Sequence, residues 1–173
     1  MKQRGYGFTL IELMVVVAIL TLLVTITYVS YGTVQGRTHD TNVQNDLRAI
    51  ATKIKKYRSE NGVYPAGDTQ LATLDIEVYK SSYGSPYITG GNGYNLVYCR
   101  MPVGAPISFA LVAYSKSGRG FMYTPTGKVQ PYTGTQGGSG VQCTAAGVPL
   151  SGTSSERDWL YDASAWKSYV GEL

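Results

Sequence analysis

The sequence predicts an α+β protein in which a long N-terminal α-helix, with a membrane half and an amphipathic half, packs against a small antiparallel β-sheet. Three observations carry this prediction: an apolar run at residues 8–29, a segment with helical periodicity at 37–60, and strand-like segments beyond residue 62. The chain has 173 residues, 43% hydrophobic and 15% charged, so it can bury a core and is too apolar for a disordered chain. A mean hydropathy of −0.09 excludes a protein that crosses the membrane many times.

The apolar run at residues 8–29 is long enough to cross a bilayer as a helix, since about 20 apolar residues suffice. Lys2 and Arg4 precede it, so the positive-inside rule keeps the N-terminus in the cytoplasm and exports the rest. An ordinary signal peptide or signal anchor is the alternative, but the run is long for a cleaved signal and lacks an A-x-A-like site. Glu12 lies inside the run, where a carboxylate costs about 2.5–3.5 kcal/mol near the bilayer centre, which indicates a functional role.

The segment Gly7-Phe8-Thr9-Leu10-Ile11-Glu12-Leu13 resembles the prepilin signature of type IV pilins and type II secretion pseudopilins. The resemblance implies that a prepilin peptidase in the membrane cuts between Gly7 and Phe8 and methylates the new N-terminus of Phe8. It also implies that Glu12 is the glutamate required for assembly. The motif covers only the first 30 residues of the chain.

This resemblance divides the chain into four parts. Residues 1–7 are expected to be a leader peptide and residues 8–31 a transmembrane and polymerisation helix. Residues 32–61 are expected to form the amphipathic second half of that helix, and residues 62–173 an extracytoplasmic β-rich head.

The charge on Glu12 has a natural partner once the leader is removed, because the cut exposes an α-amine at Phe8. In a stack of subunits, the amine of one can approach the carboxylate of its neighbour, and two charges about 4 Å apart attract by roughly 4 kcal/mol at an effective dielectric of 20. Desolvation offsets much of this attraction, so the pair is expected to set the register of the subunits more than to add stability. The alternative is that Glu12 reaches the membrane surface by itself.

Residues 37–60 continue the helix with an apolar face, because Val43, Leu47, Ile50, Ile54 and Tyr57 are spaced by 4, 3, 4 and 3 residues. Asn61-Gly62 is expected to end the helix. Gly32 and Gly36 are expected to interrupt it between its two halves, since each glycine costs about 1 kcal/mol relative to alanine. The alternative is that they mark only a bend at the membrane surface.

The head is predicted to contain an antiparallel meander. Its strands are expected at residues 94–100, 107–114, 119–123 and 127–132, and its apolar side is expected to pack on the helix. A flexible loop is expected at residues 134–140. A short helix is expected at residues 155–169.

Cys99 and Cys143 are the only two cysteines. An exported head lies in a compartment that permits disulfides, and a bridge between them would close a loop of about 45 residues and stabilise the fold by roughly 4 kcal/mol on the chain-entropy model. The family often has such a bridge in its head. Two buried thiols are the alternative.

Catalytic and metal-binding patterns are not found in the sequence, which has one histidine and no phosphate-binding loop, nucleophile elbow or zinc motif. We expect no enzyme activity, no cofactor and no metal. Glu156, Asp158 and Asp162 could hold calcium, but a solvated helix face is the favoured interpretation.

The most probable function is therefore structural: a pilin that polymerises into a type IV pilus-like filament of identical subunits, for adhesion, motility or DNA uptake. The resemblance implies a prepilin peptidase, an assembly ATPase and a platform protein as partners, with storage in the cytoplasmic membrane before an extracellular filament forms. A type II secretion pseudopilin is the alternative within the family. A membrane-anchored receptor for DNA or another polyanion is the alternative from another class.

A polyanion surface is expected on the meander's outer face. Between residues 78 and 155 there are five cations and no acidic side chain, and tyrosines are interleaved with them. Lys116, Arg119 and Lys128 are expected to share this surface and to bind DNA or another polyanion. Ordinary solubilising charges are the simpler interpretation.

Overall fold

The computed structural model of the chain describes residues 8–84, 87–89, 92–100, 108–134, 138–148, 157–162 and 165–173, without the side chains of 26–31, 33, 87–89, 92–93, 139, 157, 159 and 162. The helices are α1 (Leu10–Asn61), α2 (Gly67–Leu71) and α3 (Ser139–Ala145), with 3-10 turns η1 (Ala72–Leu74) and η2 (Lys80–Ser82). The strands are β1 (Glu77–Val78), β2 (Tyr87–Thr89), β3 (Asn92–Arg100), β4 (Phe109–Tyr114), β5 (Gly120–Tyr123), β6 (Val129–Tyr132), β7 (Arg157–Asp162), β8 (Ala165–Trp166) and β9 (Gly171–Glu172).

The chain forms two compact units, residues 1–36 and 37–173. Helix α1 contributes to both units and continues without a break through Gly32 and Gly36, so the expected interruption at these glycines is wrong. The helical hydrogen-bond pattern tolerates an isolated glycine, which weakens a helix without ending it. Within the described parts of the chain, no helix is both long enough and apolar enough to cross a membrane.

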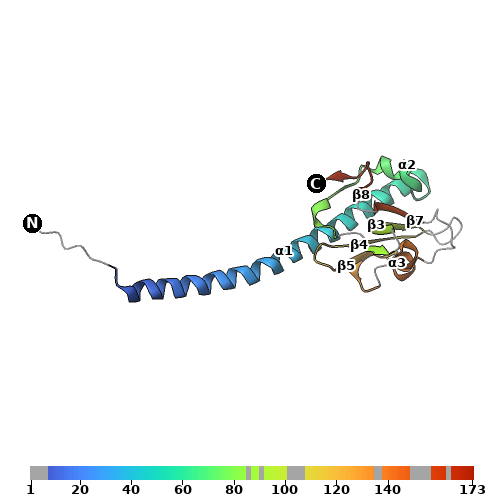
Figure 1. Ribbon diagram of the computed structural model, residues 1–173. Helices are drawn as coiled ribbons and strands as arrows, with labels where there is room; N and C mark the ends of the chain where they lie inside the picture. The colour runs from blue at the N-terminus through green and yellow to red at the C-terminus, as the bar shows by residue number, and fades with distance from the viewer. Residues whose placement is uncertain are drawn as a thin grey trace, which may run out of the picture. The chain divides into compact units, whose positions relative to one another are not determined.

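The second half of α1 packs on the sheet through the predicted apolar stripe. Val43, Leu47, Ile50 and Ile54 are all buried, and they share one hydrophobic core with residues of the strands. This result confirms the expected long helix on an antiparallel sheet. In Figure 1 the second half of α1 runs along one side of the strands.

The main sheet has the strand order β6-β5-β4-β3-β7-β8, and β2 pairs with β3 beside this path. The pairs β3–β4, β4–β5 and β5–β6 are antiparallel, which confirms the predicted meander. Strand β4 is buried along its whole length because its alternate residues face two cores. Phe109, Leu111 and Ala113 join the core under α1, whereas Ala110 and Val112 join a second core on the other side.

Helix α3 covers the second face of the sheet, opposite α1 (Figure 1). Cys143 of α3 forms a disulfide with Cys99 of β3, with Cα atoms 5.4 Å apart, so the predicted bridge is confirmed. The expectation of a flexible loop at 134–140 is wrong for Ser139 and Gly140, which begin α3; residues 135–137 lie outside the described residues. The helix forms where Cys143 and Ala146 are buried against β3 and β4, a long-range contact that the local sequence does not indicate.

The predicted short helix at 155–169 is also wrong, because Arg157–Asp162 forms strand β7 and Ala165–Trp166 forms β8. Strand β7 pairs antiparallel with β3 from Tyr94 to Cys99, and Leu160 is buried under α1. Pairing with β3 and burial of Leu160 therefore override the helix that the local sequence suggested.

A buried carboxylate connects α1 to the chain that follows β1. Asp46 is only 2% exposed, and its Oδ2 accepts hydrogen bonds from the Tyr79 backbone N–H and the Tyr83 hydroxyl, both at 3.0 Å. Burial raises the pKa of Asp46 to about 6 from an ordinary value of 3.8; these hydrogen bonds oppose the rise, and the charge of Glu172 adds to it. The head therefore contains a carboxyl group that titrates near neutral pH.

We predict that Asp46 makes the head less stable as pH rises. Because its pKa is higher in the folded state, the folded chain holds an extra proton between about pH 4 and pH 6, so the free energy of unfolding falls across this window. Asp46→Asn keeps an acceptor oxygen for both donors and removes the charge. The variant should match the wild type near pH 4 and exceed it at pH 7 by about 2–3 kcal/mol.

Denaturant unfolding of the full chain in non-ionic micelles, followed by near-UV circular dichroism, measures this difference at each pH. A constant difference between the two proteins from pH 4 to pH 7 would contradict the assignment.

Candidate assembly site

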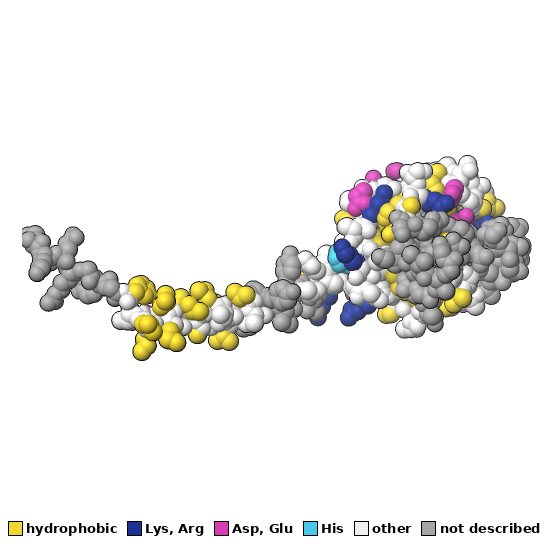
Figure 2. All heavy atoms as spheres, viewed as in Figure 1, with side chains coloured by type: hydrophobic (Ala, Val, Ile, Leu, Met, Phe, Trp, Pro, Cys, Tyr) yellow, Lys and Arg dark blue, Asp and Glu magenta, His cyan; other side chains and the backbone are white. Residues whose placement is uncertain are grey.

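The first half of α1 exposes apolar side chains. Leu10, Ile11, Leu13, Met14 and Val15 are all at least half exposed, and this pattern continues to Val24. In Figure 2 the side chains of this segment are almost all hydrophobic. Contiguous apolar surface on this scale marks a membrane or protein interface, because water is a poor solvent for it.

Helix α1 begins with a reciprocal cap formed by Thr9 and Glu12. Glu12 Oε2 accepts hydrogen bonds from the backbone N–H of Thr9 at 2.9 Å and from its hydroxyl at 2.8 Å. The Thr9 hydroxyl in turn accepts a hydrogen bond from the Glu12 backbone N–H at 3.3 Å. This arrangement is a capping box, which satisfies amide groups that have no partner within the helix.

The cap assigns Glu12 a local role that sequence reasoning missed, although the spacing Thr-x-x-Glu was a usable signal for it. All the bonds it accepts from described residues go to Oε2, so Oε1 has no partner among them. Phe8 is 82% exposed, and Gly7 lies outside the described residues. The capping box therefore uses only one of the two carboxylate oxygens of Glu12.

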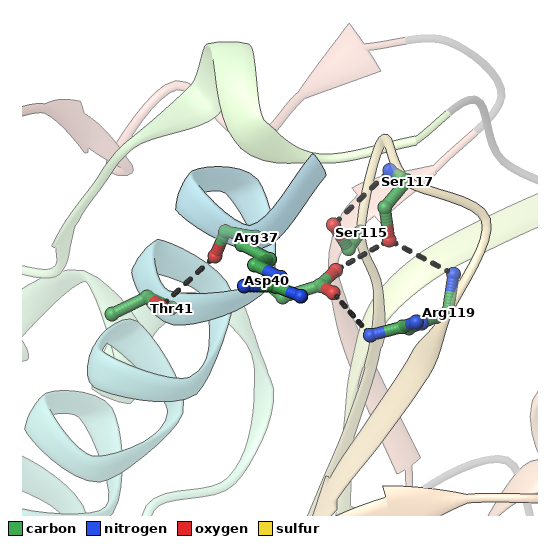
Figure 3. Close-up of polar contacts among 6 residues, drawn as sticks. All are labelled: Arg37, Asp40, Thr41, Ser115, Ser117 and Arg119. Atoms are coloured by element: carbon green, nitrogen blue, oxygen red, sulfur yellow. Dashed lines mark hydrogen bonds and ion pairs between the residues drawn. The ribbon is translucent and has the colours of Figure 1, made fainter. Parts of the chain in front are cut away.

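At the start of the head, Asp40 of α1 is bound to the turn between β4 and β5 (Figure 3). The side chain of Asp40 is buried; it accepts a hydrogen bond from the Ser117 hydroxyl and lies 3.2 Å from a guanidinium nitrogen of Arg119. Nearby, His39 and Asn42 both contact the Ser82 hydroxyl, at 3.2 and 2.9 Å. These contacts fix the first turns of α1 in the head against two loops.

The three cations expected to bind a polyanion do not gather in one place. Lys116 and Arg119 lie in the turn before β5, whereas Lys128 lies in the turn after β5. Arg119 is already paired with Asp40. The turn that contains Lys128 instead lies beside Lys55, near the C-terminal end of α1.

Of the three acidic residues considered for calcium, Glu156 and the side chain of Asp162 lie outside the described residues. Asp158 is half-buried and accepts a hydrogen bond from the Gly67 backbone N–H at 3.3 Å, and burial raises its pKa. It thus connects β7 to the start of α2 and does not lie on a solvated helix face. Among the described residues, no cluster of three metal-ligating side chains occurs.

Comparison with known proteins finds similarity in the N-terminal part of the chain. Residues 2–28 match the prokaryotic N-terminal methylation motif. The chain is 39% identical to the type IV major pilin protein PilA of Myxococcus xanthus over 63 residues, which cover 36% of this chain and 29% of that protein. It is 35% identical to the type II secretion system core protein G of Pseudomonas aeruginosa over 73 residues, which cover 42% of this chain and 51% of that protein.

These matches confirm the resemblance to type IV pilins and secretion pseudopilins. The chain covers less than two thirds of the length of either relative. No solved structure matches the chain.

The pair of Asp40 and Arg119 generates a stability prediction. Arg119→Gln leaves a buried carboxylate without its cation, which should lower the free energy of unfolding by about 1–2 kcal/mol. This value is below the 3–5 kcal/mol of a fully buried pair because Arg119 is 73% exposed. Lys116→Gln, in the same turn, is the matched control and should change it by less than about 0.5 kcal/mol. Equal effects of the two changes in denaturant unfolding would contradict the role of the pair.

Proposed function

We propose that this chain is a pilin-like structural subunit that polymerises through the first half of α1. The observation that carries the proposal is the match of residues 2–28 to the methylation motif, at the segment that exposes apolar side chains from Leu10 to Val24. In the membrane precursor, lipid covers these exposed side chains. In the filament, the same side chains of neighbouring subunits replace the lipid.

Glu12 has two roles in this proposal. Through Oε2 it caps its own helix, and through its remaining oxygen it receives the α-amine that cleavage creates on Phe8 of a neighbouring subunit. The capping box holds the carboxylate in one place beside the helix start. A fixed carboxylate favours a single vertical offset between subunits, because the amine finds its charge partner at that offset alone.

The proposed partners are the processing and assembly machinery of such filaments: a prepilin peptidase, an assembly ATPase and a platform protein. The precursor is proposed to lie in the cytoplasmic membrane with residues 1–7 inside the cell and the head outside, and the assembled filament to be extracellular. A pseudopilin of a type II secretion system is the second candidate, and the similarity to the core protein G supports it. The proposal assigns no enzymatic activity to the chain.

Processing provides the first test. We predict cleavage between Gly7 and Phe8, because the basic leader stays in the cytoplasm next to the peptidase. Mass analysis of the mature N-terminus should show methylated Phe8. A mature chain that begins at Thr33 or later would mean removal of an ordinary signal peptide and would overturn the proposal.

Substitutions at Glu12 provide the second test, because the cap and the charge can be separated. Glutamine is also a capping-box residue, so Glu12→Gln keeps the cap and removes the charge, whereas Glu12→Ala removes both. Thr9→Ala is the complementary control that weakens the cap and keeps the charge. Membrane insertion should persist in all three variants, since none adds a charge.

If the charge sets the register, Glu12→Gln and Glu12→Ala should both lower the yield of shed filaments at least tenfold, and Thr9→Ala should lower it less. Filament yield is measured on sheared surface material by electron microscopy and immunoblotting. Normal yield from Glu12→Gln would leave the carboxylate with its capping role only.

A further inference from the structure

A shallow groove at the C-terminal end of α1 is lined by Lys55, Arg58, Ser59 and Tyr64, and has a volume of about 300 Å³. It presents two cations and two hydroxyl groups, and none of its lining residues is acidic. Among the described residues, no carboxylate lies within ion-pair distance of either cation. The groove has the composition of a site for an oxyanion.

Two aromatic rings hold these cations in position. The Arg58 guanidinium lies 4.8 Å from the centre of the Tyr64 ring and donates a hydrogen bond to the Tyr64 hydroxyl at 3.1 Å. Lys55 Nζ lies 5.3 Å from the centre of the Tyr123 ring. Cations held in this way lose less side-chain entropy on binding an anion. The ring face that carries a cation is not available for stacking on the bases of a nucleic acid.

A third cation comes from the turn between β5 and β6. The turn passes beside the Lys55 ammonium, since a methyl group added to Gly127 would lie 3.7 Å from Lys55 Nζ. Lys128 follows directly and is exposed. Cations from a helix and from a turn distant in the sequence are thus brought to one edge of the head.

The dipole of α1 is too small to balance the positive charge near the C-terminal end of the helix. The C-terminal end of a helix carries about half a negative charge, whereas residues 48–58 contain five cations and no acidic residue. On the other flank, Lys53 donates a hydrogen bond to the Asp75 carbonyl and Lys56 lies 3.9 Å from Glu60. Of these five cations, only Lys56 lies within ion-pair distance of a described carboxylate, so Lys55 and Arg58 keep their positive charge uncompensated.

We propose that this groove, with Lys55, Arg58 and Lys128 around it, binds the phosphodiester backbone of double-stranded DNA. Several cations on an open surface suit a chain of closely spaced phosphates better than a single anion, because each contact releases counterions from the polymer. Binding is independent of base sequence, since the cations contact phosphates and not base edges. The proposal concerns a single subunit and does not depend on polymerisation.

The test measures the binding of the full chain, in non-ionic micelles, to a fluorescent 30-base-pair duplex by anisotropy at increasing NaCl. The variant Lys55→Gln with Arg58→Gln removes two groove cations. The control Arg37→Gln with Lys116→Gln removes two exposed cations elsewhere in the head, so both proteins lose the same net charge. The groove variant should lower the slope of log K against log salt by about 2, with at least tenfold weaker binding at 0.1 M NaCl.

The control should keep the wild-type slope to within about 0.5. Equal loss in the two variants, or no binding by the wild type at 20 mM NaCl, overturns the proposal. Tighter binding to vesicles with anionic lipid, or to polyglutamate, than to the duplex would also overturn it, because another polyanion would then be the ligand.

Two further variants keep the result interpretable. Lys55→Gln with Lys128→Gln leaves the contact of Arg58 with Tyr64 intact, so it separates loss of charge from loss of packing and should weaken binding as the first pair does. Glu12→Gln should bind DNA with an unchanged slope whether or not it assembles. Failure of the DNA site and failure of the proposed filament role are therefore distinguishable.

Discussion

The contact between the second half of α1 and the sheet is the interaction on which the head depends. One buried stripe of α1 forms the core with alternate residues of β3 and β4, and α2 and the segment around β1 pack against the same core. Asp40 and Asp46 then connect the N-terminal end of this stripe to the segments before β5 and after β1 by hydrogen bonds. Apolar burial supplies the attraction, which has no direction of its own, and these polar contacts fix the position of the helix along the strands.

A consequence of this packing is that β3 and β4 lie between two layers. Their residues alternate between the core under α1 and the core under α3, so neither strand has a face in water. The disulfide joins α3 to β3 in the second core, where a helix of seven residues has little stability of its own. The covalent bond thus holds in place the thinner of the two layers.

The two halves of α1 differ in their surfaces. The apolar stripe that begins at Val43 is buried within the subunit, whereas the apolar residues before Thr25 are exposed, and under the proposed function a bilayer or neighbouring subunits cover them. The last turns again face solvent, with cations held over tyrosine rings. One helix would therefore carry the proposed assembly surface, the core of the head and the proposed site for DNA.

The sequence alone determined the long helix, its buried stripe, the meander and the methylation motif, because each depends on periodicity or on neighbouring residues. It did not determine β7, which forms by pairing with β3, nor α3, which follows a glycine-rich segment and packs against the second core. The grouping of cations was likewise decided by tertiary structure. Arg119 is paired with Asp40, 79 residues away, and the turn before Lys128 reaches Lys55 only because the meander folds on α1. Such contacts join residues far apart in the chain, and no local pattern encodes them.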